Sequence, residues 1–250
     1  RALLEVVERD AAMLTWYTHY TPARIDVASD RELSAIEQTR FAVGGVHHVV
    51  LDLSVFHGIP AVLALVNDDD PISGVAAFGA ACSVDPRVAW LKAITEAYHT
   101  RLWALDLKRT RTRLVRRPED VRGLEDHVSF YTFPEHGRYL DFLRNPTSTI
   151  SIDRLPSLRV RSAPDAVACI ARMLQSAAVS AYAVDVTSPD VQEAGFRVAR
   201  VVCPELCRLD VSYRTRYLGG DRLYTVSRDL GLASTRLRLD DLNPYPHPFP

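Results

Sequence analysis

The hydrophobic positions at the start of the chain recur at helical spacing, and they predict a helix over residues 2–16. One face of this helix is apolar and carries Leu3, Val6, Val7, Met13 and Leu14. Asp10 projects into the same apolar arc. A carboxylate buried there without hydrogen-bonding partners would be costly, so we expect Asp10 to be paired.

Apolar runs, alternating segments and turn residues predict the remaining elements. Helices are expected over residues 32–43, 86–105, 134–143, 164–178 and 189–193, and strands over residues 48–53, 61–66, 74–81, 181–186 and 197–202. The last two strands and the short helix between them suggest a compact βαβ unit, although its crossover is shorter than usual. The expected fold class is mixed α/β (α+β), with mixed sheets covered by helices.

The long helix over residues 86–105 has a clear start, because Asp85 can cap it and Pro86 suits its first position. Its core stripe carries Trp90, Leu91, Ile94, Tyr98, Leu102 and Leu105. Arg101 projects into this stripe, where an unpaired guanidinium group would be costly. Glu96 and His99 lie on the opposite face.

Composition and charge exclude several classes of protein. The 250 residues are 47% hydrophobic and 24% charged, with a net charge of -1, so neither a nucleic acid nor a membrane is the expected partner. A basic run over residues 108–117 is typical of a solvated loop, and a landing surface for an anionic partner is the alternative. The spacing of the four cysteines fits neither a zinc site nor a disulfide framework. Reduced thiols and the absence of a recognisable signal peptide suit a cytoplasmic protein.

Candidate chemistry lies on the two long helices. The chain has no glycine-rich phosphate loop, nucleophile elbow or HExxH helix. Glu5 and Glu8 are three residues apart, so their carboxylates share one helix face and repel unless a cation lies between them. Mg²⁺ is the usual cation in such a position. Glu96 and His99 repeat this spacing on the second helix. Each pair taken alone is more typical of a solvated helix surface.

The ordered set of segments is more specific, and it resembles the YcaO family. The opening ALLEVVERDAAMLTW is similar to that family's glutamate-rich ATP-site helix. GIPAVLALV followed by GAACSVDPRVAWLKAITEAYHTRL is similar to the region of its second ATP-site helix. Later landmarks follow in order as EDHVSFYTFPE, AVDVTSPDVQEAGFRVARVVCPEL and YLGGDRLY. The end, NPYPHPFP, resembles the terminus of the azoline-forming (thiazole/oxazole) peptide cyclodehydratase branch.

This resemblance implies that ATP and Mg²⁺ are bound without a phosphate loop, by glutamates on helices. Glu5 and Glu8 match the acids of the first motif, and Glu96 matches the acid of the second. Those three residues are the expected metal ligands. Arg101 matches the arginine of the second motif and is expected to lie against a carboxylate or phosphate. His99 stands where the family usually has glutamine, Arg1 where it usually has serine, and Arg222 is a weaker candidate for a phosphate contact.

The implied activity is that of an ATP-dependent cyclodehydratase of ribosomally made precursor peptides, as in the thiazole/oxazole-modified microcins. A Cys, Ser or Thr side chain attacks the preceding backbone carbonyl, the carbonyl oxygen is phosphorylated, and phosphate leaves to give a thiazoline or oxazoline. The expected partner is a leader-binding protein that resembles E1-type (ThiF-like) enzymes, and a homodimer is also compatible. The alternatives are thioamide or amidine formation by the same ATP chemistry, and a non-catalytic scaffold with a polyproline tail.

The two ends of the sequence carry further expectations. Arg1 already lies inside a helical pattern, so we expect residues 1–250 to be a YcaO domain that lacks its N-terminal portion, within a longer protein. At the other end, alternating prolines make the tail extended before it meets a partner. Because a free tail gains nothing from Tyr245 and Phe249, we expect it to fold back to the ATP and peptide cleft. There Pro250 would place its terminal carboxylate near the reacting amide as a catalytic group. A free polyproline ligand is the alternative.

Overall fold

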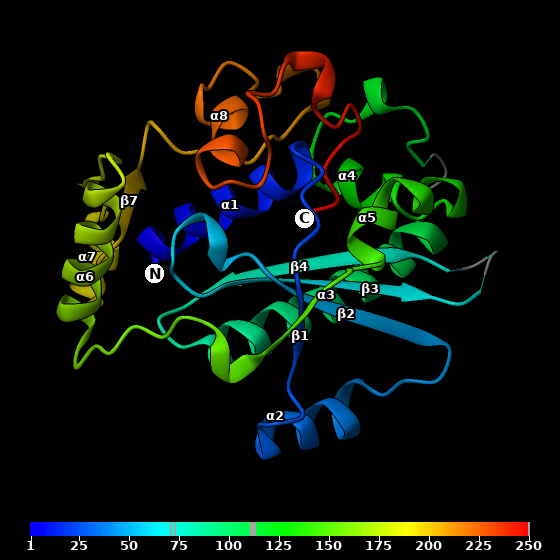
Figure 1. Cartoon of the computed structure of the whole chain (residues 1–250), viewed down its shortest axis with the longest axis horizontal. Helices are drawn as coiled ribbons and strands as arrows, with labels where there is room; N and C mark the ends of the chain where they lie inside the picture. The colour runs from blue at the N-terminus through cyan, green and yellow to red at the C-terminus, as the bar shows by residue number, and fades with distance from the viewer. Residues whose placement is uncertain (71, 73, 111–113, 250) are drawn as a thin grey trace.

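A five-stranded mixed sheet forms the centre of the molecule (Figure 1). The computed structural model describes residues 1–70, 72, 74–110 and 114–249. The strands lie in the order β4-β3-β2-β1-β5. They are β1 (Arg24–Asp26), β2 (Val46–Asp52), β3 (Ala61–Asp68), β4 (Ala76–Cys82) and β5 (Thr149–Ser151). The pairs from β1 to β4 are antiparallel, whereas β1 and β5 are parallel.

Two long helices cover opposite faces of this sheet, α1 (Ala2–Tyr17) and α3 (Pro86–Thr110) (Figure 1). Alternate residues of β3 divide between them. Leu63 and Leu65 belong to the buried cluster that contains α1, and Val62 and Val66 belong to the cluster that contains α3. A strand buried on both faces has an uninterrupted apolar sequence, which explains the run in β3.

Small residues in β4 let α3 approach closely. A Cβ atom at Gly79 would lie 2.4 Å from both the Ala93 carbonyl oxygen and the Ala97 backbone nitrogen of α3. No side chain fits in that space, so only glycine is compatible with this packing. The close contact fixes α3 against β4, and with it the height of Glu96 along the strand.

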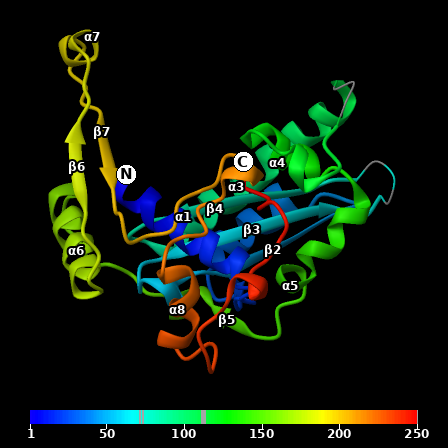
Figure 2. The same cartoon turned by 90° about the horizontal axis from the view of Figure 1, so that it is seen from above.

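The remaining helices surround this core. They are α2 (Arg31–Ile36), which continues as a π-helix over Glu37–Phe41, α4 (Leu124–Phe130), α5 (Asp141–Arg144) and α8 (Arg222–Asp229). A separate arm contains α6 (Ala163–Ser176), β6 (Tyr182–Asp185), α7 (Pro189–Glu193) and β7 (Ala199–Val202). Figure 2 shows β6, α7 and β7 projecting away from the central sheet.

The predicted fold class is confirmed, with two local corrections. The expected βαβ unit is wrong, because β6 and β7 pair antiparallel as a long hairpin that carries α7 at its tip. A connection this short cannot return a chain to the start of a parallel strand. The helix expected over 134–143 is a 3₁₀ segment, Pro134–Leu140, followed by the single turn of α5.

The basic run is partly helical instead of forming one loop. Lys108 lies in the last turns of α3 and donates to the carbonyl oxygens of Ile72, Gly74 and Thr132 at 2.8, 3.2 and 3.1 Å. Arg116 pairs with Glu135 at 2.6 Å. Two further arginines of the run, Arg111 and Arg113, lie outside the described residues. Lys108 and Arg116 therefore link neighbouring segments, whereas Arg109 and Arg117 pair locally with Asp106 and Asp120.

Candidate active site

Three acidic residues from α1 and α3 line one cleft at the edge of β4. Glu5, Glu8, Glu96 and His99 all face a space of about 670 Å³, which we call the carboxylate cleft. It is also lined by Ala80, Ala81 and Cys82 of β4, by Arg1, Arg9 and Lys92, and by Phe249 of the C-terminal tail. The three expected metal ligands, Glu5, Glu8 and Glu96, thus face one cleft.

The edge of β4 fixes both helices' carboxylates through backbone hydrogen bonds. The Cys82 N–H donates to Glu8 Oε2 at 2.9 Å, and the Ala80 N–H donates to Glu96 Oε2 at 3.1 Å. Residues two apart on an edge strand point their N–H groups the same way. This edge of β4, which pairs with no other strand among the described residues, therefore orients one carboxylate from each helix toward the cleft.

Burial and mutual repulsion raise the pKa values of these acids. The pKa of Glu8 rises to about 8, chiefly because burial penalises its charge, with further increases from the charges of Glu96 and Glu5. Burial also raises the pKa of Glu96, and Glu5 adds to this increase. Several acids held together against their own repulsion are typical of a functional site.

The cleft also contains cationic groups, and sequence reasoning missed the most informative of them. Arg9 pairs with Glu5 one helical turn away. The sequence does contain a signal for Arg9, because it follows Glu8 directly and lies four residues after Glu5, the spacing at which helical side chains pair. Arg1 and Lys92 also line the cleft and add positive charge. A mixed lining of this kind suits a polyanion that carries its own metal ions.

The donor chemistry of the cleft fits magnesium bound together with phosphate. Within the described ranges, no three His, Cys, Asp or Glu side chains already surround a single point as a metal site would. Mg²⁺ usually takes only one or two carboxylates and completes its shell with water and phosphate oxygens. Carboxylates spread along a cleft wall fit that mode of binding better than an all-protein cage.

Arg101 and Arg222 do not line the carboxylate cleft. The Arg101 Nε–H donates to Asp68 Oδ1 at 2.6 Å, at the end of β3. The expectation that Arg101 lies against a carboxylate or phosphate is confirmed, but its partner is an aspartate outside the cleft, and Arg101 is only partly buried. Arg222 binds Asp10 through Nε at 3.1 Å and Nη2 at 2.9 Å.

Asp10 is fully buried and accepts hydrogen bonds from three segments. Besides Arg222, it accepts from His57 Nε2 at 2.7 Å and from the Cys207 N–H at 2.7 Å. Although burial opposes ionisation, these partners hold the pKa of Asp10 below its ordinary value. The expected pairing of Asp10 is thus confirmed, and the network joins α1 to α8.

We expect Arg222→Gln to lower the free energy of unfolding by about 3 kcal/mol, because it leaves a buried carboxylate short of its main counter-charge. Urea unfolding measures this loss. The matched control is Arg236→Gln, which removes an exposed pair with Asp221 and should change stability by less than about 1 kcal/mol. A stable Arg222→Gln protein with a raised KM for ATP would instead support the phosphate contact.

The C-terminal tail, residues 243–249, folds back onto its own domain, as predicted. Its carbonyl oxygens accept hydrogen bonds from side chains of the body. Trp16 Nε1 donates to Tyr245 at 3.0 Å, the Tyr131 hydroxyl donates to Pro246 at 2.6 Å, and His127 Nδ1 donates to His247 at 2.7 Å. A free polyproline ligand is inconsistent with this tail, because most of its residues are buried.

The tail ends beside the acidic residues. Phe249 is 5% exposed, packs against Phe78 of β4 with ring centroids 5.8 Å apart, and lines the carboxylate cleft. Pro250 lies outside the described residues. The tail therefore brings the end of the described chain to the wall of the cleft.

A buried pair of histidines links the tail to the body of the domain. The pair predicts that the folded protein loses stability at acid pH. The rings of His127 and His247 stack at 3.9 Å, and burial lowers the pKa of both. The unfolded chain therefore binds protons that the folded protein excludes, and stability is lost as pH falls below about 6.5. We expect His247→Gln to flatten the dependence of the free energy of unfolding on pH between about 7.5 and 5.5.

The control for this measurement is His47→Gln, which changes an exposed histidine on β2. It should keep the slope of the parent protein. If His247→Gln and His47→Gln have the same slope, the buried pair does not cause the acid sensitivity.

The fold and cleft define a mixed α/β protein whose helices present carboxylates at a sheet edge, without a glycine-rich phosphate loop. The chain belongs to the YcaO family. The family model described as YcaO cyclodehydratase, ATP- and Mg²⁺-binding, matches residues 1–207. The resemblance found in the sequence is therefore confirmed. No curated protein matches the chain significantly.

Solved structures share this fold. A heterocyclase in complex with substrate and cofactor matches with a TM-score of 0.76 and 25% identity, over 99% of this chain and 31% of its own. The heterocyclase TruD matches with a TM-score of 0.69 and 25% identity, over 99% of this chain and 32% of its own. YcaO from Methanopyrus kandleri, bound with AMPPCP and Mg²⁺, has a TM-score of 0.58 and 24% identity, over 82% and 50%. The chain thus spans about a third of the length of the two heterocyclases.

The helices in the described part of the chain are all too short or too polar to cross a bilayer.

Proposed function

We propose that this chain is the ATP-site portion of a cyclodehydratase that converts Cys, Ser or Thr residues of a ribosomally made peptide into thiazolines or oxazolines. The observation that carries the proposal is the carboxylate cleft, where the edge of β4 orients Glu8 and Glu96 from two different helices. Family membership and the similarity to two heterocyclases support the choice of reaction.

Seven polar residues of the cleft have a proposed part. Glu5, Glu8 and Glu96 would hold magnesium, and Arg1, Arg9, Lys92 and His99 would lie against the nucleotide. The bound magnesium nucleotide would supply the phosphoryl group that turns the amide oxygen into a leaving group. The chain's own share is positioning and charge neutralisation, which dominate phosphoryl transfer. Arg101 and Arg222 would act indirectly, by fixing β3 and α1.

The tail would complete the peptide side of the site. Pro250 follows Phe249, so we propose that its terminal carboxylate lies near the reacting amide as a proton acceptor. We also propose that a leader-binding, E1-like partner delivers the precursor peptide.

Oxygen labelling tests the reaction. The full-length protein, its partner and a peptide labelled with ¹⁸O in the amide carbonyl before a cysteine are incubated with ATP. We expect the peptide to lose one water mass per ring, and the labelled oxygen to appear in phosphate. A sulfur- or nitrogen-substituted backbone would favour thioamide or amidine formation. Unchanged peptide with no phosphate release would favour a scaffold.

A further inference from the structure

A buried carboxylate, that of Asp210, connects the last turn of α1 to the segment between β7 and α8. Its Oδ2 accepts a hydrogen bond from the hydroxyl of Tyr17, the last residue of α1, and its Oδ1 accepts one from the Tyr217 N–H at 2.6 Å. Burial raises the pKa of Asp210, and the hydrogen bond from Tyr17 is the largest effect that opposes this increase. The Tyr17 hydroxyl therefore stabilises a charge that burial disfavours.

Two residues of the C-terminal tail bind the same pair through its backbone oxygens. His247 Nε2 donates to the Asp210 carbonyl oxygen at 2.6 Å, and the Asn243 N–H donates to the Tyr17 carbonyl oxygen at 2.9 Å. All four residues are buried. Tyr17, Asp210, His247 and Asn243 thus form a closed ring of hydrogen bonds, which we call the tail clamp. This ring fixes the tail relative to α1 at both ends of residues 243–247.

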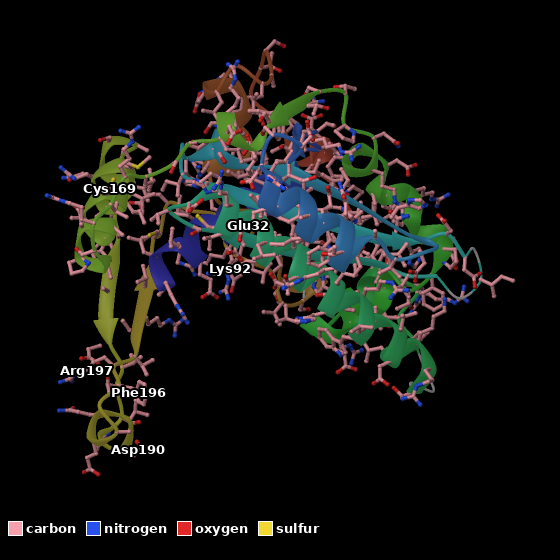
Figure 3. The ribbon with its side chains drawn as sticks, turned by 90° about the horizontal axis from the view of Figure 1, so that it is seen from below. Glu32, Lys92, Cys169, Asp190, Phe196 and Arg197 are labelled. Atoms are coloured by element: carbon pink, nitrogen blue, oxygen red, sulfur yellow. The ribbon has the colours of Figure 1, made fainter. Side chains whose placement is uncertain are left out.

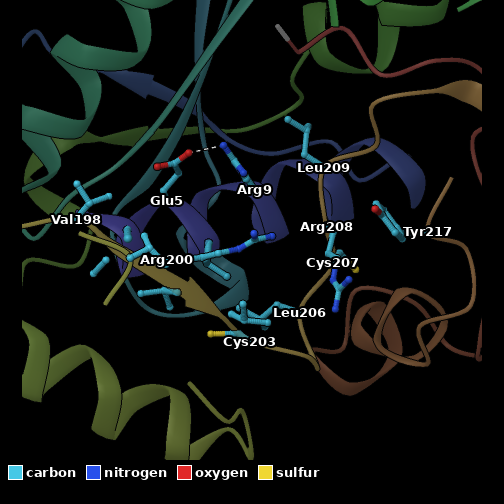
Figure 4. Close-up of a pocket in the computed structure, with 16 residues that line it drawn as sticks. Glu5, Arg9, Val198, Arg200, Cys203, Leu206, Cys207, Arg208, Leu209 and Tyr217 are labelled. Atoms are coloured by element: carbon cyan, nitrogen blue, oxygen red, sulfur yellow. Dashed lines mark hydrogen bonds and ion pairs between the residues drawn. The ribbon is translucent and has the colours of Figure 1, made fainter. Parts of the chain in front are cut away.

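The tail clamp holds two apolar residues that line the carboxylate cleft. Leu209 directly precedes Asp210 and lines the cleft together with Arg9 of α1 (Figure 4). Phe249 follows shortly after His247 and lines the same cleft. Because Asp210 binds His247, a displacement of Asp210 would move both apolar residues. Their positions beside the acids therefore depend on the clamp.

We propose that Tyr17 and Asp210 are positioning residues for ring formation, because the hydrogen bond between them sets where the apolar residues of the cleft lie. This proposal rests on the proposed function. The edge of β4 holds the carboxylates of the cleft separately, through its own N–H groups. Loss of the clamp should therefore leave nucleotide binding intact and displace only the side of the cleft that the tail forms. A displacement of about 1 Å at a reacting centre can lower a rate about 100-fold.

Tyr17→Phe tests the clamp, because it removes the hydroxyl and keeps the ring in the core. With the full-length protein, its partner and saturating peptide, kcat for ring formation should fall about tenfold, while KM for ATP changes less than about twofold. The matched control is Tyr224→Phe, which removes a hydroxyl that donates to the Leu218 carbonyl at 2.5 Å, outside the clamp. Equal losses of kcat in the two variants, or a raised KM for ATP in Tyr17→Phe, would overturn the proposal.

Asp210→Asn is a second variant, and it decides the question if Tyr17→Phe does not fold. An asparagine amide has one oxygen acceptor where aspartate has two, so it cannot serve both Tyr17 and Tyr217 with separate oxygens. The kcat for ring formation should again fall about tenfold. The double variant should lose little more than the more impaired single variant, because both substitutions remove the same link. Additive losses would mean that the two residues act separately, and the proposal would fail.

Amide exchange measures the clamp without any turnover. In Tyr17→Phe, the N–H of Asn243, whose acceptor is the Tyr17 carbonyl, should exchange at least about tenfold faster than in the parent protein. The internal reference is the Phe196 N–H, which donates to the Val191 carbonyl at 3.1 Å near the tip of the arm (Figure 3) and should keep its exchange rate. Unchanged exchange at Asn243 would overturn the proposal. A parent protein that forms no rings would refute the proposed function, whereas this measurement would still decide whether the clamp holds the tail.

Discussion

Glu8→Gln is expected to lower ATP-dependent ring formation at least about 100-fold, because Glu8 is proposed to hold the magnesium that would neutralise charge where the phosphoryl group moves. The amide oxygen of glutamine can still accept the Cys82 N–H, so the link between α1 and the edge of β4 persists. Glu5→Gln should act in the same direction. Phosphate release and the mass of the peptide measure both effects on the full-length protein with its partner.

The fold should survive this substitution. Burial and neighbouring acids raise the pKa of Glu8 to about 8, so at neutral pH the folded protein binds a proton that the unfolded chain releases, and this costs folding free energy. A neutral amide removes that cost, and the melting temperature should stay the same or rise. The matched control is Glu32→Gln on α2, an exposed position outside the cleft. Normal phosphate release in both Glu5→Gln and Glu8→Gln would disprove the assignment of these acids.

The elements that sequence predicts well are those determined by local pattern. The apolar stripes of α1 and α3 repeat every turn, and the run in β3 is continuous because both faces are buried. β1 and β5 have three residues each, too few to show any periodicity, and they form by pairing with segments far away in sequence. The sequence of β6, α7 and β7 predicts a parallel unit wrongly, because the pattern of two strands flanking a helix does not show whether the strands pair parallel or antiparallel.

The residues of the site also divide into those that local spacing relates and those that only the tertiary structure brings together. Spacing along one helix pairs Glu5 with Glu8. Only the family resemblance joins Glu96 to them in the sequence, and the edge of β4 shows how the structure does so. Arg101 and Arg222 match motif positions, yet Asp68 and Asp10 pair with them, and each partner is distant in sequence. A periodicity analysis identifies a charged residue in an apolar stripe without identifying its counter-ion.

The aromatic residues of the tail hold its proline-rich segment on the domain. Tyr245 stacks on Tyr139 with ring centroids 3.5 Å apart, and Phe249 packs on Phe78. Prolines between them keep the backbone extended, so little entropy is lost when it is ordered. The extended backbone presents the carbonyl oxygens of Tyr245 and Pro246 to Trp16 Nε1 and the Tyr131 hydroxyl, which donate hydrogen bonds to them.

Removing residues 248–250 is expected to lower ring formation at least about 100-fold, because the proposed proton acceptor and the adjoining wall of the cleft are lost. Since Phe249 is buried, the truncation should also lower the free energy of unfolding by about 1.5–3 kcal/mol, which urea unfolding measures. The two effects are separated by a full-length protein whose C-terminus is amidated, which changes only the terminal charge. If the carboxylate takes the proton, the amidated protein should keep its stability and still lose most ring formation. Normal cyclisation by the amidated protein would restrict the tail to a structural role, and normal cyclisation by the truncated one would remove it from the site.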